Sequence, residues 1–320
     1  MQAAVVRAFD APPIYTTFPD PIPEAGELPV TVTAAGLHQI VKSLANGTHY
    51  GSTEELPFVP GVDGVGRLAD GTRVYFGGVR APFGTFAERA NANGKVWVPL
   101  PEGLDDATAA GIANPGMSSL VALTARAKFV AGESVLVLGA TGVAGQLAVQ
   151  IAKRKCARRV VAAGRNPQAL EKLKGLGADA VISLDQEQDT LIAAFRAEFA
   201  GEGVDVVLDY VWGQPAESVL SAIAQRGLSK AAPRVRFIQI GASASANINL
   251  HAATLRSSGL ELLGSGFGSA SLDQILKAVA EFFREAASNP FEFKVKTAPL
   301  SEVEGLWNSP EQGTRLVFQP

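Results

Sequence analysis

Residues 136–145 read Leu136-Val137-Leu138-Gly139-Ala140-Thr141-Gly142-Val143-Ala144-Gly145. This stretch is the clearest indication of the fold of the chain. An apolar run leads into glycines spaced GxxGxxG, and residues 146–155 continue with apolar side chains at helical spacing. Glycine lets a backbone turn tightly and approach a pyrophosphate, whose charge then lies at a helix N-terminus. Between a strand and a helix, this spacing predicts a dinucleotide site, with an ordinary structural turn as the alternative. The residues assigned to the site are Gly139, Thr141, Gly142, Val143, Ala144 and Gly145.

Alternating strands and helices continue downstream of the glycine stretch. Proline opens a helix expected over 167–176. Short apolar runs predict buried strands at 134–138, 159–163, 180–183, 204–208, 236–240 and 260–263. Such alternation is typical of a parallel sheet covered on both faces, so residues 116–265 are expected to form a doubly wound α/β domain of Rossmann type.

The regions on either side of this domain have a different pattern. Residues 1–115 contain short strand-like runs separated by proline or glycine, which predicts a mostly β domain of barrel type. Helices are expected there only near 40–44 and 106–113. The tail, 266–320, combines an amphipathic helix at 271–287 with strands at 291–295 and 315–318, and is expected to rejoin the first domain.

The end of the second α/β strand indicates which dinucleotide binds. Sites that prefer NAD place Asp or Glu there to hold the ribose hydroxyls. This chain instead has Gly164-Arg165-Asn166, with no acid. A guanidinium binds a 2′-phosphate through two parallel hydrogen bonds. The sequence therefore favours NADPH, with Gly164, Arg165 and Asn166 in the site, unless Arg165 simply covers a solvated loop.

Composition excludes several classes of protein. The 320 residues carry 28 basic and 31 acidic side chains without a basic run, so nucleic acid is not an expected partner. No apolar stretch is long enough to span a membrane, and Arg7 interrupts any signal-peptide core, which predicts a cytoplasmic protein. Cys156 is the only cysteine beside three histidines, so neither a disulfide nor a metal site is expected.

Several segments in this order resemble a known family. They are Leu56–Gly66, Gly139–Gly145 and Leu176–Ile182. Together they are similar to the zinc-free medium-chain dehydrogenase/reductases of the quinone oxidoreductase type. The resemblance implies a GroES-like first domain over 1–115 and 266–320, and NADPH-dependent hydride transfer to a quinone or an α,β-unsaturated carbonyl in the cleft between the domains. It also implies a homodimer, paired through the edge strand at 260–263.

The resemblance adds further cofactor residues outside the glycine stretch. Ser118 lies where relatives use a hydroxyl against the cofactor. Gly241 and Ser243 match the turn beside the nicotinamide ribose, and Ser265-Gly266-Phe267 matches the segment facing the nicotinamide amide. Each position also has a simpler interpretation as loop geometry.

Departures from the family pattern affect the expected chemistry. Val62 stands where zinc-dependent relatives have a histidine ligand, and His38 lies near their first cysteine ligand. Val41 replaces an Asp of quinone reductase relatives. We therefore expect catalysis without metal, with His38 and Tyr50 as candidates for proton delivery or for the substrate pocket and water as the alternative proton source.

The sequence excludes one other function and leaves two others open. A short-chain reductase needs Tyr-x-x-x-Lys, and no tyrosine here has lysine four positions later. An enoyl-thioester reductase of the same fold stays open, because the sequence does not show pocket shape. A non-enzymatic NADPH-binding redox sensor or crystallin-like protein is the alternative from another class.

Overall fold

The computed structural model describes residues 1–224, 232–310 and 313–320, which form two compact units. One unit joins Met1–Asn114 to Leu276–Pro320, and the other comprises Pro115–Ile275. We call them the β unit and the α/β unit. No helix in the described ranges is long and apolar enough to cross a membrane.

The α/β unit is built on a parallel sheet with the strand order β10-β9-β8-β11-β12-β13. Every residue of β8 and β11 is buried, because helices cover both faces, and such strands read as continuous apolar runs. The strands are β8 (Ser134–Leu138), β9 (Arg159–Gly164), β10 (Ala180–Ser183), β11 (Val206–Asp209), β12 (Arg234–Gln239) and β13 (Gly259–Gly264).

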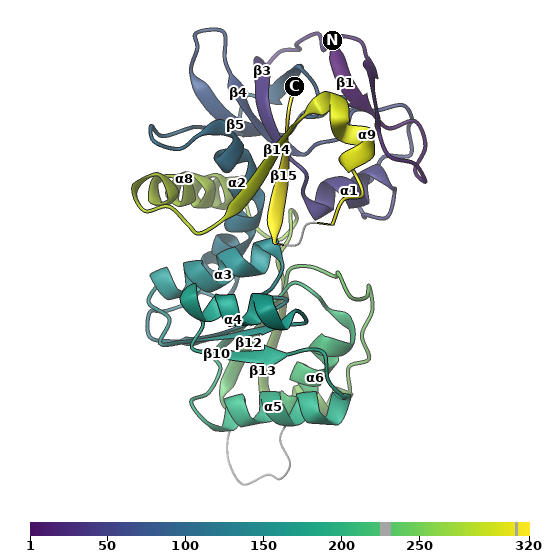
Figure 1. Ribbon diagram of the computed structural model, residues 1–320. Helices are drawn as coiled ribbons and strands as arrows, with labels where there is room; N and C mark the ends of the chain where they lie inside the picture. The colour runs from purple at the N-terminus through teal and green to yellow at the C-terminus, as the bar shows by residue number, and fades with distance from the viewer. Residues whose placement is uncertain (225–231, 311–312) are drawn as a thin grey trace. The chain divides into compact units, whose positions relative to one another are not determined.

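Helices alternate with these strands. They are α3 (Val143–Arg154), α4 (Pro167–Gly175), α5 (Gln188–Ala200), α6 (Gly213–Ile223) and the short α7 (Ala252–Arg256). Figure 1 shows α3 and α4 on one face of the sheet and α5 and α6 on the other. The chain runs outward from β8 through β9 to β10, then returns to β11 on the opposite side of β8. This reversal creates the switch point at which doubly wound sheets bind ligands.

The β unit is mostly antiparallel. A hairpin pairs β1 (Gln2–Val5) with β2 (Ile14–Thr17), and a second sheet has the order β14-β15-β3-β4-β5-β7, with β6 also paired to β3. Its strands are β3 (Glu27–Gly36), β4 (Asp63–Arg67), β5 (Arg73–Gly77), β6 (Arg89–Asn93), β7 (Trp97–Pro99), β14 (Lys294–Pro299) and β15 (Thr314–Gln319). Its helical segments are α1 (Gln39–Ala45), the part of α8 (Leu272–Ser288) from Leu276 onward, the 3₁₀ turn η2 (Leu300–Glu302) and α9 (Val303–Leu306). The predicted class, a doubly wound parallel sheet beside a mostly β domain, is confirmed.

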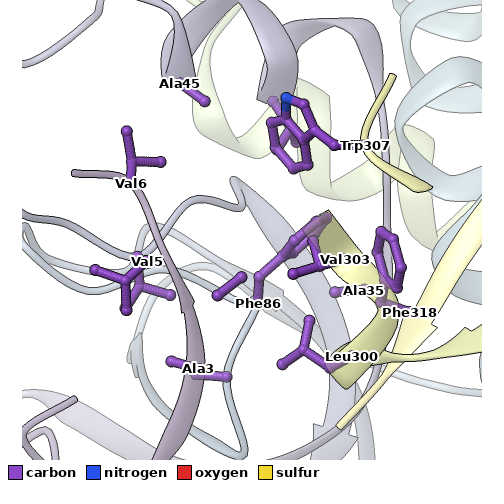
Figure 2. Packing of buried hydrophobic residues seen from close by; sticks show 14 of the residues in the cluster. Ala3, Val5, Val6, Ala35, Ala45, Phe86, Leu300, Val303, Trp307 and Phe318 are labelled. Atoms are coloured by element: carbon purple, nitrogen blue, oxygen red, sulfur yellow. The ribbon is translucent and has the colours of Figure 1, made fainter. Parts of the chain in front are cut away.

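Aromatic packing joins the two ends of the chain in the β unit. Phe86 is fully buried. Its ring forms T-shaped contacts with Trp307 and Phe318, with ring centroids 6.1 and 5.6 Å apart. Figure 2 shows these rings with Val5 from the N-terminal strand and Leu300 from the tail. Burying an aromatic side chain of this size contributes about 1.5–3 kcal/mol. The tail therefore belongs to the core of the β unit.

Two elements differ from their expected extents. Helix α2 (Asp106–Val121) continues through Pro115 into the π-helical turn η1 (Ala122–Arg126), whereas the pattern predicts an end near residue 113. Buried residues flank the proline on both sides, so packing offsets the hydrogen bond that proline cannot donate. The strand expected at 291–295 begins only at Lys294. Phe291 lies before it, with its ring centroid 5.0 Å from that of Phe282 in α8.

Candidate functional site

Most of the predicted cofactor residues lie at one edge of the parallel sheet, where the carboxyl ends of its strands meet. The carboxyl ends of β8, β9, β11, β12 and β13 lead into 139–145, 164–166, 210–212, 241–243 and 265–267 respectively. Because the strands are parallel and adjacent, these segments lie side by side along that edge. Doubly wound sheets bind nucleotides at this edge, outside the carboxyl ends of their strands.

The glycine loop leaves no room for side chains at two of its glycines. Gly139 has φ of 90°, and a Cβ there would lie 2.7 Å from Val211 Cγ1. At Gly145 a Cβ would lie 2.5 Å from Ala140 Cα. Gly142 precedes α3 in an extended conformation, and no side chain caps this helix end. The uncapped first-turn N–H groups form a place for an anion, and the loop backbone can approach it closely.

The end of β9 is joined tightly to this loop. The N–H groups of Gly139 and Ala140 donate to the Ala163 carbonyl at 2.9 and 2.8 Å. A Cβ at Gly164 would collide with the Thr141 side chain. The structure thus brings together the two segments that the sequence assigned to pyrophosphate and ribose.

Arg165 and Asn166 have different environments. Arg165 is exposed, and none of the described acidic residues forms an ion pair with it. Asn166 is occupied locally, because its Oδ1 accepts the Ala169 N–H at 2.9 Å and so caps α4. Of these two side chains, Arg165 is the one available for an anionic ribose substituent.

The ends of β11 and β12 pack on one another. Asp209 is fully buried, and its Oδ1 accepts the N–H groups of Val211 and Trp212 at 2.9 and 3.0 Å. Burial raises the pKa of Asp209 to about 6. A Cβ at Gly241 would lie 2.7 Å from the Tyr210 carbonyl oxygen, and the Ser243 hydroxyl donates to that oxygen at 3.2 Å.

Ser118 lies on α2, next to a residue that contacts this edge. The hydroxyls of Ser118 and Ser119 donate to the Pro115 carbonyl at 2.9 and 3.0 Å. Ser119 Oγ also lies 2.7 Å from Tyr210 Oη. Sequence reasoning assigned Ser118 but missed Ser119 and Tyr210. The available signal was an Asp-Tyr pair at the end of an apolar run, with Asp209 as the last residue of β11 and Tyr210 directly after it.

Arg126 forms hydrogen bonds to the turn after β13. Its guanidinium donates to the carbonyls of Gly264 and Ser269 at 2.7 and 3.0 Å. The Ser265 N–H donates to the Gln239 carbonyl at 2.8 Å, which ties the turn to β12. Phe267 is 51% exposed, so an apolar ring is presented to solvent at this edge of the sheet.

The β unit contains a buried polar cluster around His38, which precedes α1 and is 1% exposed. His38 Nε2 lies 3.6 Å from Asp63 Oδ1, and the Tyr75 hydroxyl donates to Asp63 Oδ2 at 2.7 Å. Burial raises the pKa of Asp63 to about 6. Burial, with the nearby positive charge of Arg315, lowers the pKa of His38 well below its usual value. His38 is therefore neutral at physiological pH.

Tyr50 lies in a very different environment from His38. Its side chain is 82% exposed, and its ring lies over His49 with the centroids 4.1 Å apart. No hydrogen bond or ring contact joins it to His38 in the described part of the chain. The structure therefore does not bring the two predicted catalytic side chains into contact.

Residues for a metal centre are not assembled here. Nowhere in residues 1–224, 232–310 and 313–320 do three or more His, Cys, Asp or Glu converge as metal ligands. A catalytic zinc ion takes three protein ligands. His38 and Asp63 supply two donor side chains, so the residues present do not fit the zinc site of zinc-dependent dehydrogenases.

Comparison with known proteins gives the family. Residues 143–284 match the family model described as zinc-binding dehydrogenase. A probable NADPH-dependent quinone reductase of Emericella nidulans is 29% identical, with both chains covered in full. A quinone oxidoreductase of Lama guanicoe is 30% identical over 78% of this chain and 75% of its own. The chain belongs to the quinone oxidoreductase-like medium-chain dehydrogenase/reductases. The predicted resemblance is confirmed.

The structural similarity of this quinone oxidoreductase-like protein to a solved relative extends over its whole length. The quinone oxidoreductase of Thermus thermophilus, solved alone and with NADPH, superposes with a TM-score of 0.77. The two chains are 26% identical, and each is covered in full. The GroES-like unit and the Rossmann unit are therefore both those of the family.

Proposed function

We propose that the protein is an NADPH-dependent oxidoreductase that reduces a quinone or an α,β-unsaturated carbonyl without a metal ion. The observation that carries this proposal is the edge of the parallel sheet. There an uncapped helix N-terminus and a glycine loop with no room for a side chain at Gly139 or Gly145 adjoin Arg165, with no acid at the end of β9. The names of the relatives support the same activity.

The residues present fit the dinucleotide. Backbone N–H groups of residues 143–145, in the uncapped first turn of α3, would hold the pyrophosphate, and Arg165 would hold the 2′-phosphate. Gly241, Ser243, Ser118 and 265–267 would contact the nicotinamide half. When bound, NADPH supplies a hydride from its nicotinamide ring, and the protein contributes position and the exclusion of water.

The proton that follows the hydride is assigned to water. His38 is neutral because of its burial, and a neutral imidazole is a poor acid at physiological pH. Tyr50 is mostly exposed. We therefore keep Tyr50 as a candidate residue that contacts the acceptor, and the buried His38 as a candidate that supports the wall of the acceptor pocket without touching the acceptor.

The test is NADPH oxidation with three acceptors: benzoquinone, a simple alkenal and crotonyl-CoA. Turnover with the quinone or the alkenal supports the proposal. Turnover with the thioester alone would instead make the protein an enoyl-thioester reductase. Tight NADPH binding without turnover of any acceptor would favour a redox sensor or a crystallin-like protein.

The proposal includes a homodimer formed through β13, the last strand in the order of the parallel sheet. Strand β13 ends the strand order, and its Leu262 is 37% exposed. Edge strands present unpaired backbone groups that pair readily with another chain. A twofold axis beside β13 would continue the sheet into a second copy.

A further inference from the structure

Tyr210 lies at the switch point of the sheet without a role in the function proposed above. It directly follows β11, the strand that flanks β8 on the side opposite β9. A Cβ at Gly139 would lie 3.3 Å from Tyr210 Cβ, so the tyrosine adjoins the glycine loop. Its side chain is only partly buried, whereas Asp209 before it is fully buried.

Two contacts of Ser119 bear on the direction of the Tyr210 hydroxyl. Ser119 Oγ lies 2.7 Å from Tyr210 Oη, where either hydroxyl can be the donor, and 3.0 Å from the Pro115 carbonyl, which can only accept. A serine hydroxyl has one hydrogen, so the phenol is the donor to Ser119 in the arrangement in which Ser119 donates to Pro115. Ser118, whose hydroxyl also donates to Pro115, is the other hydroxyl that faces this phenol.

In that arrangement the phenol oxygen is left as an acceptor. Its hydrogen is directed to Ser119, and its lone pairs can receive an N–H or O–H group from a ligand. Burial raises the pKa of Tyr210 to about 12, so the hydroxyl keeps its hydrogen at physiological pH. The side chain is thus a neutral, oriented acceptor at the edge where the strands end.

The topology indicates which half of the dinucleotide meets this acceptor. The pyrophosphate belongs at the α3 N-terminus, and the phosphorylated ribose belongs over β9, beside Arg165. The other half of the molecule must extend across β8 in the opposite direction, over β11 and β12. That half, the nicotinamide nucleoside, carries hydrogen-bond donors in its carboxamide and its ribose hydroxyls.

We propose that Tyr210, held by Ser119, is a binding residue that accepts a hydrogen bond from the nicotinamide nucleoside and so positions the ring. The inference rests on the proposed function, because it takes the ligand to be NADPH. It assigns Tyr210 a contact with the reacting half of the cofactor and none with the adenosine half.

The test compares two ligands in Tyr210→Phe. Calorimetry gives the Kd of NADPH and of 2′-phospho-ADP, which keeps the adenosine half and lacks both the nicotinamide and its ribose. We expect Tyr210→Phe to weaken NADPH about threefold to tenfold, as for one lost neutral hydrogen bond, while 2′-phospho-ADP binds as in the wild type. Tyr15→Phe, a tyrosine of β2 that is 38% exposed, is the matched control and should change neither Kd.

A second variant and an analogue sharpen the result. Ser119→Ala, which frees the phenol hydrogen, should also weaken NADPH selectively. With the acetylpyridine analogue, which lacks the amide donors, equal binding to wild type and Tyr210→Phe identifies the carboxamide as the donor. A persisting difference identifies the ribose.

Equal weakening of both ligands by Tyr210→Phe would overturn the inference and leave a structural role. An unchanged NADPH affinity in Tyr210→Phe would also overturn it while the proposed function stands. A wild-type protein that does not bind NADPH would overturn the proposed function, and the inference with it.

Discussion

Arg165 is the residue on which the cofactor preference depends. It is exposed at the end of β9, next to the capped start of α4. Arg165→Ala should weaken NADPH about tenfold and leave NADH unchanged, because a charge-assisted contact to the 2′-phosphate is lost and solvent reduces its strength. Fluorescence titration with both cofactors measures this.

Lys172→Ala is the control for the Arg165 prediction. It removes an exposed positive charge from α4 in the same unit and should leave both affinities as they are. If Arg165→Ala weakens both cofactors equally, Arg165 is not a phosphate ligand.

Asp63 gives stability a pH dependence. Its pKa is raised to about 6 in the folded protein from an ordinary value of 3.8, so the folded state binds the proton more tightly than the unfolded chain does. Stability from this group is present below pH 3.8 and is lost as the pH rises toward 6. Asp63→Asn keeps an acceptor for Tyr75 without the buried charge. Its unfolding free energy should exceed that of the wild type by an amount that grows across this window to about 3 kcal/mol.

Urea unfolding at several pH values measures that difference. The pKa of His38 is lowered in both proteins, so its opposite trend with pH largely cancels in the comparison. Glu54→Gln, at an exposed carboxylate of the same unit, should follow the wild-type profile. A constant difference between Asp63→Asn and the wild type would contradict the assignment.

Local and long-range residues differed in how far the sequence revealed them. The glycine loop and Arg165 are parts of continuous motifs, so their spacing could be interpreted directly. The Asp63–Tyr75 contact depends on the register of β4 and β5, in which Val65 pairs with Tyr75. The Ser119–Tyr210 contact joins residues 91 positions apart. Neither register nor helix placement is visible in one sequence.

At the scale of elements, the turn from β8 into α3 depends on Gly145. A methyl group there would press on Ala140, so Gly145→Ala must shift the loop at a cost of about 1–3 kcal/mol. We expect a lower Tm and weaker NADPH binding. Thermal unfolding with and without NADPH measures both effects.

Gly175→Ala serves as the matched control for the loop. Gly175 is the last residue of α4, and a Cβ there would meet nothing within 4 Å. This substitution should leave NADPH binding unchanged and the Tm equal or higher, since alanine favours a helix by up to about 1 kcal/mol over glycine. A Gly145→Ala protein that behaves like Gly175→Ala would contradict the described packing.

The elements were predictable to the degree that burial marked them. Strands β8 and β10 have the predicted bounds. All of β8 is buried, and strands covered on both faces form unbroken apolar runs. In the β unit, β2 and β6 were missed. The sequence of β6, Arg-Ala-Asn-Ala-Asn, lacks the branched and aromatic residues that favour strands, and pairing with β3 holds it in place.

At the scale of the whole molecule, the homodimer proposal predicts a particle of twice 33.3 kDa. Leu262→Lys should convert it to 33.3 kDa monomers, because a charge on the edge strand opposes pairing. Sedimentation velocity measures the mass. Leu255→Lys, at an exposed leucine of α7, should remain dimeric. A wild-type protein that sediments only as a monomer would remove the proposal.

We propose that the protein reduces its quinone or α,β-unsaturated carbonyl acceptor with NADPH in preference to NADH. The most direct test is kcat/KM for the two cofactors at one fixed concentration of benzoquinone and, in parallel, of a simple alkenal. We predict turnover with NADPH and a preference of about tenfold or more over NADH, as expected for one charge-assisted contact to the 2′-phosphate. Equal or faster oxidation of NADH, or no oxidation of NADPH with either acceptor, would contradict the proposed activity.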